Sequence, residues 1–520
     1  MQRSSGKNKL NKQLVIPMSG IGARFIAAGY RSPKPLIEVA GKPVIQHILE
    51  MYPGWKNILF VVNSDHYTDS SLHLEATLME LAPTAKIHVI GAHKLGPSFA
   101  IQEAKEMLID DGPIVINYCD FAGKFDLDEF ENKIFKYDSV LLTYTGFHPH
   151  MLRSSKFAYL KMDEGRFLDI QEKQSYTTTP MQEQASAGAY SFINRKVLVQ
   201  SIETQIKNGF TLNSELYTSL TVKALIKDGG SVGSTLMSKF FQWGTPEDLQ
   251  DFNYWMDAIS AIPVESKYEG ALPNHVVLLA GGKGARISAV TKDPKPLLKV
   301  INRPLWEEAF KARNSFSTNY LVIRDSLKQY FNEDLFQDVF TLTQETRGQA
   351  DSALIGINSI IDSNPVTVLA SDCILPNAIV TQAVNLIRET ECDLVVWSSK
   401  NYPPALLDPN SFSWVLGDSE VSSYSLKALP SSIGGTINLV TGNFTFKDVS
   451  TARILIEKLI ADKTKMINSE FYLDSTIGIA LELGLKVHIM EIPHFISLGT
   501  RDELETFRYW SDSTVGIADA

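Results

Sequence analysis

The amino-acid sequence predicts an α/β protein built from two tandem Rossmann-like domains, each with a mostly parallel sheet flanked by helices. Short β-rich runs alternate with longer stretches of helical spacing, which favours such a sheet. Matching motifs recur in the same order in the two halves of the 520 residues. In each half the first apolar run leads into a glycine turn, which is typical of a ligand site at the carboxyl end of a parallel strand.

Repeated motifs indicate two copies of one domain. "NSELYTS" at 213–219 matches "NSEFYLD" at 468–474, and "GTPEDLQDFNYW" at 244–255 matches "GTRDELETFRYW" at 499–510. Both matches have the same spacing of 255 positions, and chance resemblance of short motifs does not produce matches in a fixed order. We therefore expect four segments: a flexible basic arm at 1–13, a first domain at 14–255, a linker at 256–274 and a second domain at 275–520.

Within each copy, apolar runs rich in β-branched residues predict buried strands. The expected strands are 57–62, 86–91, 113–118 and 139–144 in the first copy and 319–324, 366–371 and 393–398 in the second. Two stretches between them, 97–109 and 348–361, have apolar residues at helical spacing. This alternation supports a parallel sheet with crossover helices.

Composition excludes several classes of protein. Apolar content of 44% and charge of 21% are ordinary for a globular protein, and a formal net charge of −10 argues against a general nucleic-acid or anionic-membrane surface. The three cysteines, Cys119, Cys373 and Cys392, form no Cys-x-x-Cys pair, so we expect a reducing environment. No apolar run has the length of a membrane span. We expect a cytoplasmic protein that binds neither nucleic acid nor membrane.

Two glycine loops are the strongest candidates for chemistry. "LVIPMSGIGAR" at 14–24 and "VVLLAGGKGAR" at 276–286 are each followed, nine or ten residues after the arginine, by Lys-Pro-Leu. A strand that runs into such a loop presents backbone N–H groups that can surround a phosphate. Walker A is excluded because no Gly-Lys-Ser/Thr is present, and the dinucleotide fingerprint because Phe25 and Ile287 replace its third glycine. An arginine and a lysine could therefore converge on a polyphosphate.

These motifs resemble those of the sugar-phosphate nucleotidyltransferases, or NDP-sugar pyrophosphorylases, which open with Gly-x-Gly-x-Arg and a Lys-Pro-Leu segment. The resemblance covers nearly all of the chain except the arm and the linker. It implies two tandem nucleotidyltransferase-like domains of the GT-A type. It also implies an enzyme that joins a nucleoside triphosphate to a sugar 1-phosphate, releases pyrophosphate and uses Mg²⁺. Such an enzyme would supply surface polysaccharide or glycoconjugate synthesis.

The resemblance implies a role for each matching residue. The nucleotide phosphates would be held by Gly20, Gly22, Arg24 and Lys34 in the first copy and by Gly281, Gly282, Gly284, Arg286 and Lys295 in the second. The nucleobase would meet Gly96, Gly348 and Gln349. Mg²⁺ would bind Asp120 in "NYCD" and Asp372 in "LASD". The sugar phosphate would contact Glu172, Lys173 and Gly188 in the first copy and Lys427, Gly442 and Asn443 in the second.

The chain departs from the family pattern in three places. Gln242 and Ser497 replace a second metal-binding aspartate, for which Asp474 is a substitute in the second copy. Only Lys427 remains there of the Glu-Lys pair. The repeated glutamates Glu215 and Glu470 either cap a helix or line the sugar site, and capping is favoured.

Three alternatives remain open at this stage. A cytidylyltransferase-type enzyme would act on a non-sugar phosphate, such as phosphocholine or glycerol phosphate. One copy could instead be a non-catalytic binding or regulatory module. A glycosyltransferase is disfavoured, because the glycine loop suits a triphosphate better than a ready-made NDP-sugar. The nucleobase, the acceptor and the formation of a homo-oligomer are not determined by the sequence.

Overall fold

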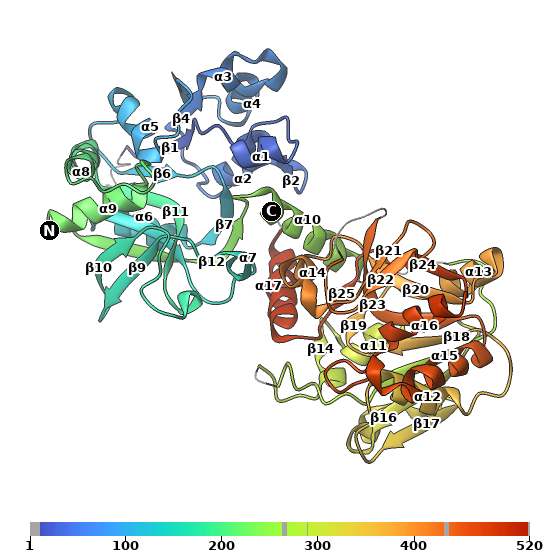
Figure 1. Cartoon of the computed structure of the whole chain (residues 1–520). Coiled ribbons are helices and arrows are strands. Elements are labelled where there is room, and N and C mark those ends of the chain that lie inside the picture. The colour runs from blue at the N-terminus through green and yellow to red at the C-terminus, as the bar shows by residue number, and fades with distance from the viewer. Residues whose placement is uncertain (1–10, 263–267, 289, 431–435, 518–520) are drawn as a thin grey trace. The chain divides into compact units, whose positions relative to one another are not determined.

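The chain divides into two compact units. We describe it from a computed structural model that covers residues 11–262, 268–288, 290–430 and 436–517, with side chains described to residue 512 (Figure 1). Unit 1 is Met1–Asn253 and unit 2 is Tyr254–Ala520, so the division falls inside helix α10 (Pro246–Ala261). Residues 1–10 of the expected arm and 263–267 of the expected linker lie outside the described residues.

A mixed sheet forms the centre of unit 1. Its strands lie in the order β5 (Lys86–Ile90), β4 (Ile58–Asn63), β1 (Gln13–Met18), β6 (Ile114–Asn117), β11 (Ala185–Phe192), β8 (Ser139–Tyr144), β12 (Val232–Gln242) and β7 (Phe121–Phe125). Strands β5, β4, β1 and β6 pair in parallel, and β11 runs antiparallel between β6 and β8. The hairpin of β9 (Tyr159–Asp163) and β10 (Arg166–Gln171) joins the sheet through β11.

The sheet of unit 2 repeats this order. Its strands are β17 (Asp338–Leu342), β16 (Ser317–Arg324), β13 (Asn274–Ala280), β18 (Val366–Ala370), β23 (Ile437–Phe446), β20 (Leu394–Ser399) and β24 (Val487–Glu491). The hairpin of β21 (Trp414–Leu416) and β22 (Ser423–Ser425) pairs with β23, as the β9–β10 hairpin does with β11. The shared order confirms the predicted fold class of two tandem, mostly parallel α/β domains.

Helices flank both sheets (Figure 1). Those of unit 1 are α1 (Ala23–Ala27), α2 (Val44–Glu50), α3 (Ser64–Thr68), α4 (Leu74–Leu81), α5 (Pro97–Glu103), α6 (Leu127–Ile134), α7 (His150–Arg153), α8 (Arg195–Lys207) and α9 (Thr218–Lys227). Those of unit 2 are α11 (Leu305–Phe310), α12 (Gln349–Ile357), α13 (Val380–Thr390), α14 (Pro403–Leu407), α15 (Val449–Ala461), α16 (Thr476–Glu482) and α17 (Arg501–Ile517). The expected helices at 97–109 and 348–361 are confirmed by α5 and α12. No helix among the described residues combines the length and apolar character needed to cross a bilayer.

Short elements follow the two glycine loops and reach the same sheet ends. Each Lys-Pro-Leu forms a 3₁₀ turn, η1 (Lys34–Leu36) or η5 (Lys295–Leu297), before a small hairpin. The hairpins are β2 (Glu38–Val39) with β3 (Lys42–Pro43), and β14 (Lys299–Val300) with β15 (Arg303–Pro304). In unit 2 a further short pair joins β19 (Cys373–Ile374) to β25 (Ile496–Ser497).

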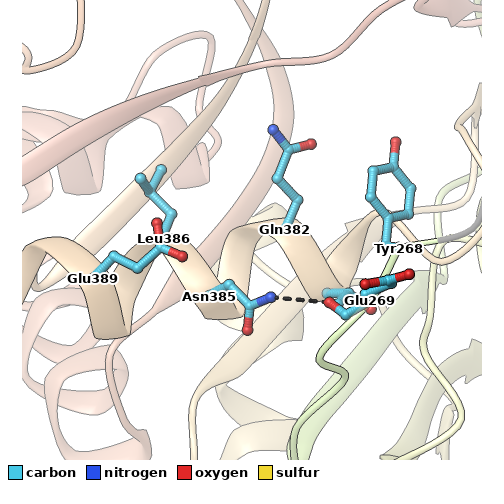
Figure 2. Close-up of a pocket in the computed structure, with 7 residues that line it drawn as sticks. Tyr268, Glu269, Gln382, Asn385, Leu386 and Glu389 are labelled. Atoms are coloured by element: carbon cyan, nitrogen blue, oxygen red, sulfur yellow. Dashed lines mark hydrogen bonds between the residues drawn. The ribbon is translucent and has the colours of Figure 1, made fainter.

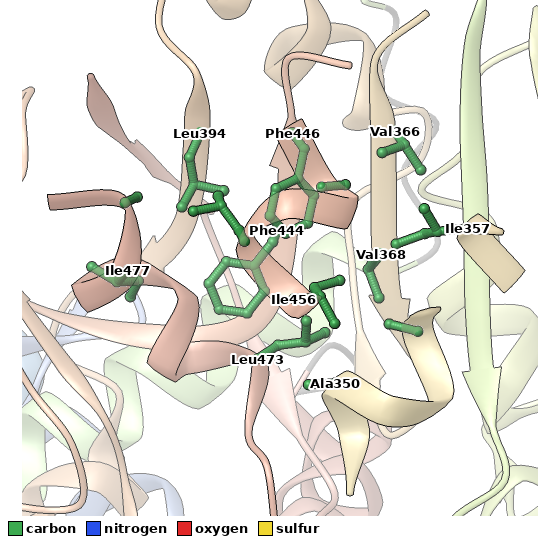
Figure 3. Packing of buried hydrophobic residues seen from close by; sticks show 14 of the residues in the cluster. Ala350, Ile357, Val366, Val368, Leu394, Phe444, Phe446, Ile456, Leu473 and Ile477 are labelled. Atoms are coloured by element: carbon green, nitrogen blue, oxygen red, sulfur yellow. The ribbon is translucent and has the colours of Figure 1, made fainter. Parts of the chain in front are cut away.

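Alternating apolar residues build the core of unit 2 on one face of its sheet. Val366 and Val368 of β18 and Phe444 and Phe446 of β23 point the same way, because successive strand residues alternate between faces (Figure 3). Helices α12 and α15 cover them with other buried side chains. The cluster also includes Leu473, which is fully buried and fixes the 3₁₀ turn η10 (Leu473–Ser475) beside the sheet.

One predicted strand was assigned the wrong environment. The segment 86–91 was expected to be a buried strand, but β5 lies at the edge of the sheet and only its last residue, Ile90, is buried. An edge strand has a neighbour on one side alone, and its apolar pattern does not reveal this.

Two histidines lie in an aromatic cluster of unit 1. His148 and His150 are buried, and the centroids of their rings lie within 5.8 Å of those of Tyr144 and Phe240. Burial lowers the pKa of His148 to about 4. Burial, with the nearby His148 and Arg153, holds the pKa of His150 well below its ordinary value.

This cluster predicts acid sensitivity of unit 1. The pKa of each histidine is lower in the folded than in the unfolded chain, so proton uptake favours unfolding. Stability should be complete above about pH 6.5 and should fall by about 1.4 kcal/mol per pH unit for each histidine below that value. The contribution of His148 should level off near pH 4, its folded pKa. Urea unfolding at several pH values, read by pulsed hydrogen exchange at one labelling pH, measures this slope. His148→Gln and His150→Gln should each reduce the dependence of stability on pH. An equal dependence in wild type and both variants contradicts the lowered pKa values.

Candidate functional site

The glycine loop of unit 1 follows β1 directly. Gly22 has a left-handed backbone (φ 70°) and precedes α1, so that the chain turns sharply after the strand. Asn63, at the end of β4, donates from Nδ2 to the carbonyl of Ser19 (3.2 Å), and the Ser19 hydroxyl lies 2.8 Å from His93 Nε2. These contacts hold the start of the loop. Arg24 is exposed beyond it.

The loop of unit 2 is held at the same point by charged side chains. Gly284 has φ 65°, and Arg324, at the end of β16, donates from Nε to the carbonyl of Gly281 (2.8 Å). Arg324 in unit 2 and Asn63 in unit 1 thus have the same role, because each donates to a backbone carbonyl at the start of the glycine loop. Glu345 forms ion pairs with Lys283 of the loop and with Arg324. The described residues of this loop continue as turns rather than as a helix like α1.

The structure brings the predicted lysine and the predicted metal aspartate together in both units. Lys34 Nζ lies 3.1 Å from Asp120 Oδ2, and Lys295 Nζ lies 2.5 Å from Asp372 Oδ2. Both aspartates follow the strand beside the one that leads into the glycine loop, which is why their side chains meet lysines distant in sequence. The backbone carbonyl of Asp120 accepts from Trp243 N, and that of Asp372 accepts from Leu498 N, each at 2.8 Å.

Asp372 is held in its charged form. Loss of contact with water raises its pKa, but the ammonium of Lys295, its hydrogen bond and the charge of Arg286 outweigh that effect, so that the pKa lies below the ordinary value. An ionised carboxylate at neutral pH is the form that binds a cation.

A repeated capping box lies next to each lysine–aspartate pair. In unit 2, Thr500 N donates to Glu503 Oε2 (2.8 Å) while Glu503 N donates to Thr500 Oγ1 (3.2 Å). Thr245 and Asp248 make the same exchange in unit 1. Burial raises the pKa of Asp248 to about 6 and raises that of Glu503. Both acids lie in the repeated Gly-Thr motif. That motif was used only as evidence for the repeat, so the two acids were not predicted as site residues.

Two predicted nucleobase glycines make the same close backbone contact. Gly96 precedes α5 and Gly348 precedes α12, with φ of 89° and 125°. A Cβ on Gly96 would lie 2.7 Å from the backbone of Leu216, and one on Gly348 would lie 2.6 Å from the backbone of Phe471. Only glycine permits this approach. The contact joins the loop before each helix to the repeated Asn-Ser-Glu segment.

That segment is a tight hairpin turn in both units, so the favoured interpretation as a helix cap was wrong. Asn213 and Ser214 both have left-handed backbones (φ 53° and 64°), and backbone hydrogen bonds join Leu212 to Glu215 in both directions. Asn468 to Glu470 repeat this turn. Helix α9 begins after Tyr217 without a side-chain cap. The carboxylates of Glu215 and Glu470 instead raise the pKa of Tyr217 and Tyr472, after the larger effect of burial.

The repeated tyrosines, which the sequence did not single out, contact the lysines that are predicted to hold the acceptor phosphate. The Lys173 ammonium lies 4.5 Å from the ring centroid of Tyr217 and donates to its hydroxyl. The Lys427 ammonium lies 5.1 Å from the ring of Tyr472, although its segment has little sequence similarity to that of Lys173. In unit 2, the charge of Arg286 in the glycine loop lowers the pKa of Tyr472 against the larger effect of burial, so the guanidinium lies near this tyrosine. The tyrosine therefore lies near both the arginine of the glycine loop and the lysine that is predicted to hold the acceptor phosphate.

The other residues predicted to contact the acceptor differ in their burial and in their hydrogen bonds within the fold. Glu172 accepts from the hydroxyl of Ser219 (2.5 Å), and burial raises its pKa. Gly442 accepts from Gln349 Nε2 (3.3 Å), which connects the predicted nucleobase and sugar sides. Asn443 is fully buried, and its amide hydrogen bonds Ala370 N and Thr441. Its side chain is therefore hydrogen bonded within the fold, and its contact with a sugar stays a prediction.

The residues present fit a magnesium ion that arrives with its nucleotide. Asp120 and Asp372 are 29% and 37% exposed and each has an oxygen beyond the one paired with lysine. Gln242 and Ser497 pair with the residues that follow these aspartates, so no carboxylate stands there. Within the described ranges, no group of three or more His, Cys, Asp or Glu side chains forms a ready-made metal site. Mg²⁺ in phosphate-transfer sites commonly takes one or two carboxylates and completes its shell with phosphate oxygens and water.

A separate cavity of about 250 Å³ lies elsewhere in unit 2. Asn385 of α13 donates from Nδ2 to the carbonyl of Glu269 (3.3 Å) at its wall (Figure 2). The lining residues are Tyr268, Glu269, Thr381, Gln382, Asn385, Leu386 and Glu389. None of them is a predicted site residue, so this cavity is not part of the candidate active site.

Comparison with known families identifies a nucleotidyltransferase domain in each half of the chain. Residues 14–258 match the family described as Nucleotidyl transferase, and residues 276–421 match the family described as MobA-like NTP transferase domain. The chain belongs to the nucleotidyltransferases and carries two domains of this kind in tandem.

Individual relatives are distant. The Bifunctional protein GlmU of Methanocaldococcus jannaschii is 25% identical over 267 residues, which are 51% of this chain and 58% of the relative. The UTP–glucose-1-phosphate uridylyltransferase YngB of Bacillus subtilis is 32% identical over 126 residues, which are 20% of this chain and 42% of the relative. The chain thus spans less than two thirds of the length of these relatives.

Solved structures show similarity over one domain's length. A nucleoside-diphosphate-sugar pyrophosphorylase from Vibrio cholerae is 19% identical with a TM-score of 0.39, covering 46% of this chain and 98% of that chain. A UTP-bound UGPase from Acinetobacter baumannii is 18% identical with a TM-score of 0.36, covering 46% of this chain and 91% of that chain.

Proposed function

We propose that the chain is a sugar-phosphate nucleotidyltransferase, which forms an NDP-sugar from a nucleoside triphosphate and a sugar 1-phosphate and releases pyrophosphate. The lysine–aspartate pair beside a glycine loop, present in both units, carries this proposal. The names of several relatives describe the same class of reaction. The product would supply surface polysaccharide or glycoconjugate synthesis, and we place the reaction in the cytoplasm, where nucleoside triphosphates are available.

The chain's own residues would act by position and charge. The nucleophile is a phosphate oxygen that is already an anion, so the site needs no general base. The glycine loop and Arg24, or Arg286 in unit 2, would hold the β- and γ-phosphates as they become the leaving group, because a guanidinium can bind phosphate in a bidentate manner. Lys34 and Lys295 would neutralise charge near the α-phosphate. Lys173 and Lys427, positioned over the tyrosine rings, would hold the attacking phosphate.

A magnesium ion would be held by Asp120 or Asp372 together with nucleotide oxygens. When bound, it would offset the charge that develops on the phosphates. Lys34 and Lys295 already pair with these aspartates, so each lysine would keep its carboxylate oriented toward the nucleotide.

Pyrophosphate release by the full chain tests the proposal. Each of the four nucleoside triphosphates is combined with a panel of phosphates: hexose 1-phosphates, N-acetylhexosamine 1-phosphates, glycerol 3-phosphate and phosphocholine. We expect Mg²⁺-dependent release with at least one sugar 1-phosphate. Release only with glycerol phosphate or phosphocholine would identify the non-sugar enzyme. Size-exclusion chromatography with light scattering determines whether a homo-oligomer forms.

Arg24→Ala and Arg286→Ala should each weaken binding of a triphosphate at their own site. A charge-assisted hydrogen bond contributes roughly 1.5–3 kcal/mol, so the dissociation constant should rise by about 10- to 150-fold. Calorimetry with a non-hydrolysable triphosphate measures this change. Lys196→Ala, which removes an exposed charge on α8, is the control and should leave the affinity unchanged. Unaltered affinity at both sites in both arginine variants contradicts the phosphate-loop assignment.

A further inference from the structure

The acceptor sides of the two units carry a carboxylate on different elements. In unit 1, Glu172 follows strand β10 and is hydrogen bonded to Ser219, the second residue of α9. In unit 2, Leu426 follows strand β22, and Asp474 of η10 occupies the position of Ser219 in the repeat. The carboxylate therefore lies after the strand in unit 1 and at the start of the helical segment in unit 2.

The lysines that follow these positions establish the correspondence. Lys173 and Lys427 both have left-handed backbones, with φ of 59° and 53°, and each places its ammonium over the ring of the repeated tyrosine. Leu426, immediately before Lys427, thus corresponds to Glu172, immediately before Lys173.

Strand β22 and the segment that carries Asp474 are in contact. A Cβ on Gly478 of α16 would lie only 2.0 Å from the hydroxyl oxygen of Tyr424, so the tyrosine packs directly on the helix. Lys427 contacts Tyr472 on the other side of Asp474 in the sequence. Leu426 lies between Tyr424 and Lys427 in β22 and the turn after it, and Asp474 lies between Tyr472 and Gly478.

Asp474 is a mostly buried residue at the start of the helical segment of unit 2. It is 6% exposed, next to the fully buried Leu473 that fixes η10 in the core (Figure 3). Within the described part of the chain, its carboxylate takes part in no protein hydrogen bond or ion pair. Its oxygens are not among the fully buried polar atoms that lack a partner, so they keep contact with solvent and can accept hydrogen bonds from a ligand.

The glycine that is predicted to contact the sugar has fewer close neighbours in unit 2 than in unit 1. In unit 1, a Cβ on Gly188 would lie 3.2 Å from the rings of Tyr118 and Phe121. On the matching Gly442, the nearest atom would be Gln349 Nε2 at 4.0 Å. Ala370 stands in unit 2 where Tyr118 stands in unit 1. The removal of an aromatic side chain leaves room for a larger acceptor.

We propose that Asp474 selects the acceptor of unit 2 and that this acceptor is a hydroxyl-bearing phosphate larger than the one used by unit 1. The inference rests on the proposed function. The carboxylate of Asp474 accepts hydrogen bonds from hydroxyl groups of a sugar or polyol phosphate, while Lys427 binds the phosphate. The two units consequently use different acceptors within one chain.

The test uses the full-length chain with Asp120→Asn, so that turnover reports on unit 2. Asp474→Ser, which introduces the residue of unit 1, should raise the KM for the preferred hydroxylated acceptor by about tenfold or more, with the KM for the triphosphate unchanged. Asp474→Asn, of the same shape, should give an intermediate rise. Glu457→Gln on the exposed face of α15 is the matched acid control and should change neither constant. In the same Asp120→Asn chain, Leu426→Glu combined with Asp474→Ser should shift the acceptor preference of unit 2 toward that of unit 1. The preference of unit 1 is measured separately in the Asp372→Asn chain.

Each other outcome overturns the proposal. A rise in the KM for the triphosphate or in the Mn²⁺ dissociation constant, with unchanged acceptor KM, makes Asp474 a nucleotide or metal residue. A lower Tm with all constants unchanged makes it structural. Preference of unit 2 for phosphocholine, which has no hydroxyl, excludes the hydroxyl contact. If wild type releases no pyrophosphate with any pair, the proposed function fails separately. Calorimetric binding of the same acceptors to wild type and Asp474→Ser then still decides the role of Asp474.

Discussion

Asparagine in place of Asp120 or Asp372 is expected to reduce pyrophosphate release by the altered unit by about 100-fold or more. Each carboxylate lies within 3.1 Å of a lysine at the end of the strand beside the glycine loop. Asparagine keeps the shape of the side chain but removes its charge, so the lysine loses its ion pair and a magnesium ion loses its protein ligand. Gln242 and Ser497, which pair with the residues that follow these aspartates, offer no second carboxylate to replace the lost charge.

The two single variants also decide whether both units are catalytic. If both are, each variant keeps the activity of the other unit with its own acceptor, and the double variant is inactive. If one unit is a binding or regulatory module, only one variant loses turnover. Asp128→Asn and Asp338→Asn, at exposed positions of α6 and β17, are the controls. A Mn²⁺ titration in the presence of triphosphate should show weaker metal binding in the altered unit. Full activity in EDTA, or in the double variant, would rule out the function proposed here.

The sequence predicts which segments form strands and helices better than it predicts where each strand lies in its sheet and how far it is buried. Apolar runs such as 113–118 and 366–371 predict strands because both faces of a central parallel strand are buried, and β6 and β18 confirm this. The run at 86–91 has similar composition but forms an edge strand, since the identity of neighbouring strands is not encoded in the run itself. The Asn-Ser turn was missed because two consecutive left-handed residues usually signal their presence by Asn-Gly or Asp-Gly.

For the candidate site as well, the sequence predicts individual residues but not the contacts between them. The repeated motifs marked Lys34 and Asp120, and their counterparts, without showing that they form a pair across 86 residues. The correspondence between Lys427 and Lys173 rests on the tyrosine ring below each ammonium, a contact that no local pattern contains. Asn443 fits the motif, but the motif does not reveal that its side chain is buried and accepts a hydrogen bond from Ala370 N.

Gly348→Ala is expected to lower the free energy of unfolding of unit 2 by about 3 kcal/mol or more, the largest stability effect that the site predicts. The backbone of Gly348 (φ 125°, ψ −174°) lies in a region essentially restricted to glycine. An added Cβ would also lie 2.6 Å from the backbone nitrogen of Phe471, which must then move. Movement would break two hydrogen bonds of that residue, Phe471 N to Arg347 O (2.8 Å) and Ala350 N to Phe471 O (3.0 Å).

Gly484→Ala separates the two causes, because Gly484 also has a positive φ (70°) but an added Cβ would meet no atom within 4 Å. It should lower the stability of unit 2 by about 1–2 kcal/mol, from backbone strain alone. Urea unfolding read by hydrogen exchange at unit 2 peptides measures both variants. Since α12 starts at Gln349, Gly348→Ala should also weaken triphosphate binding to unit 2, whereas Gly484→Ala should not. Equal destabilisation by the two variants, with unchanged triphosphate affinity, would show that the contact between Gly348 and Phe471 neither stabilises unit 2 nor positions its nucleobase loop.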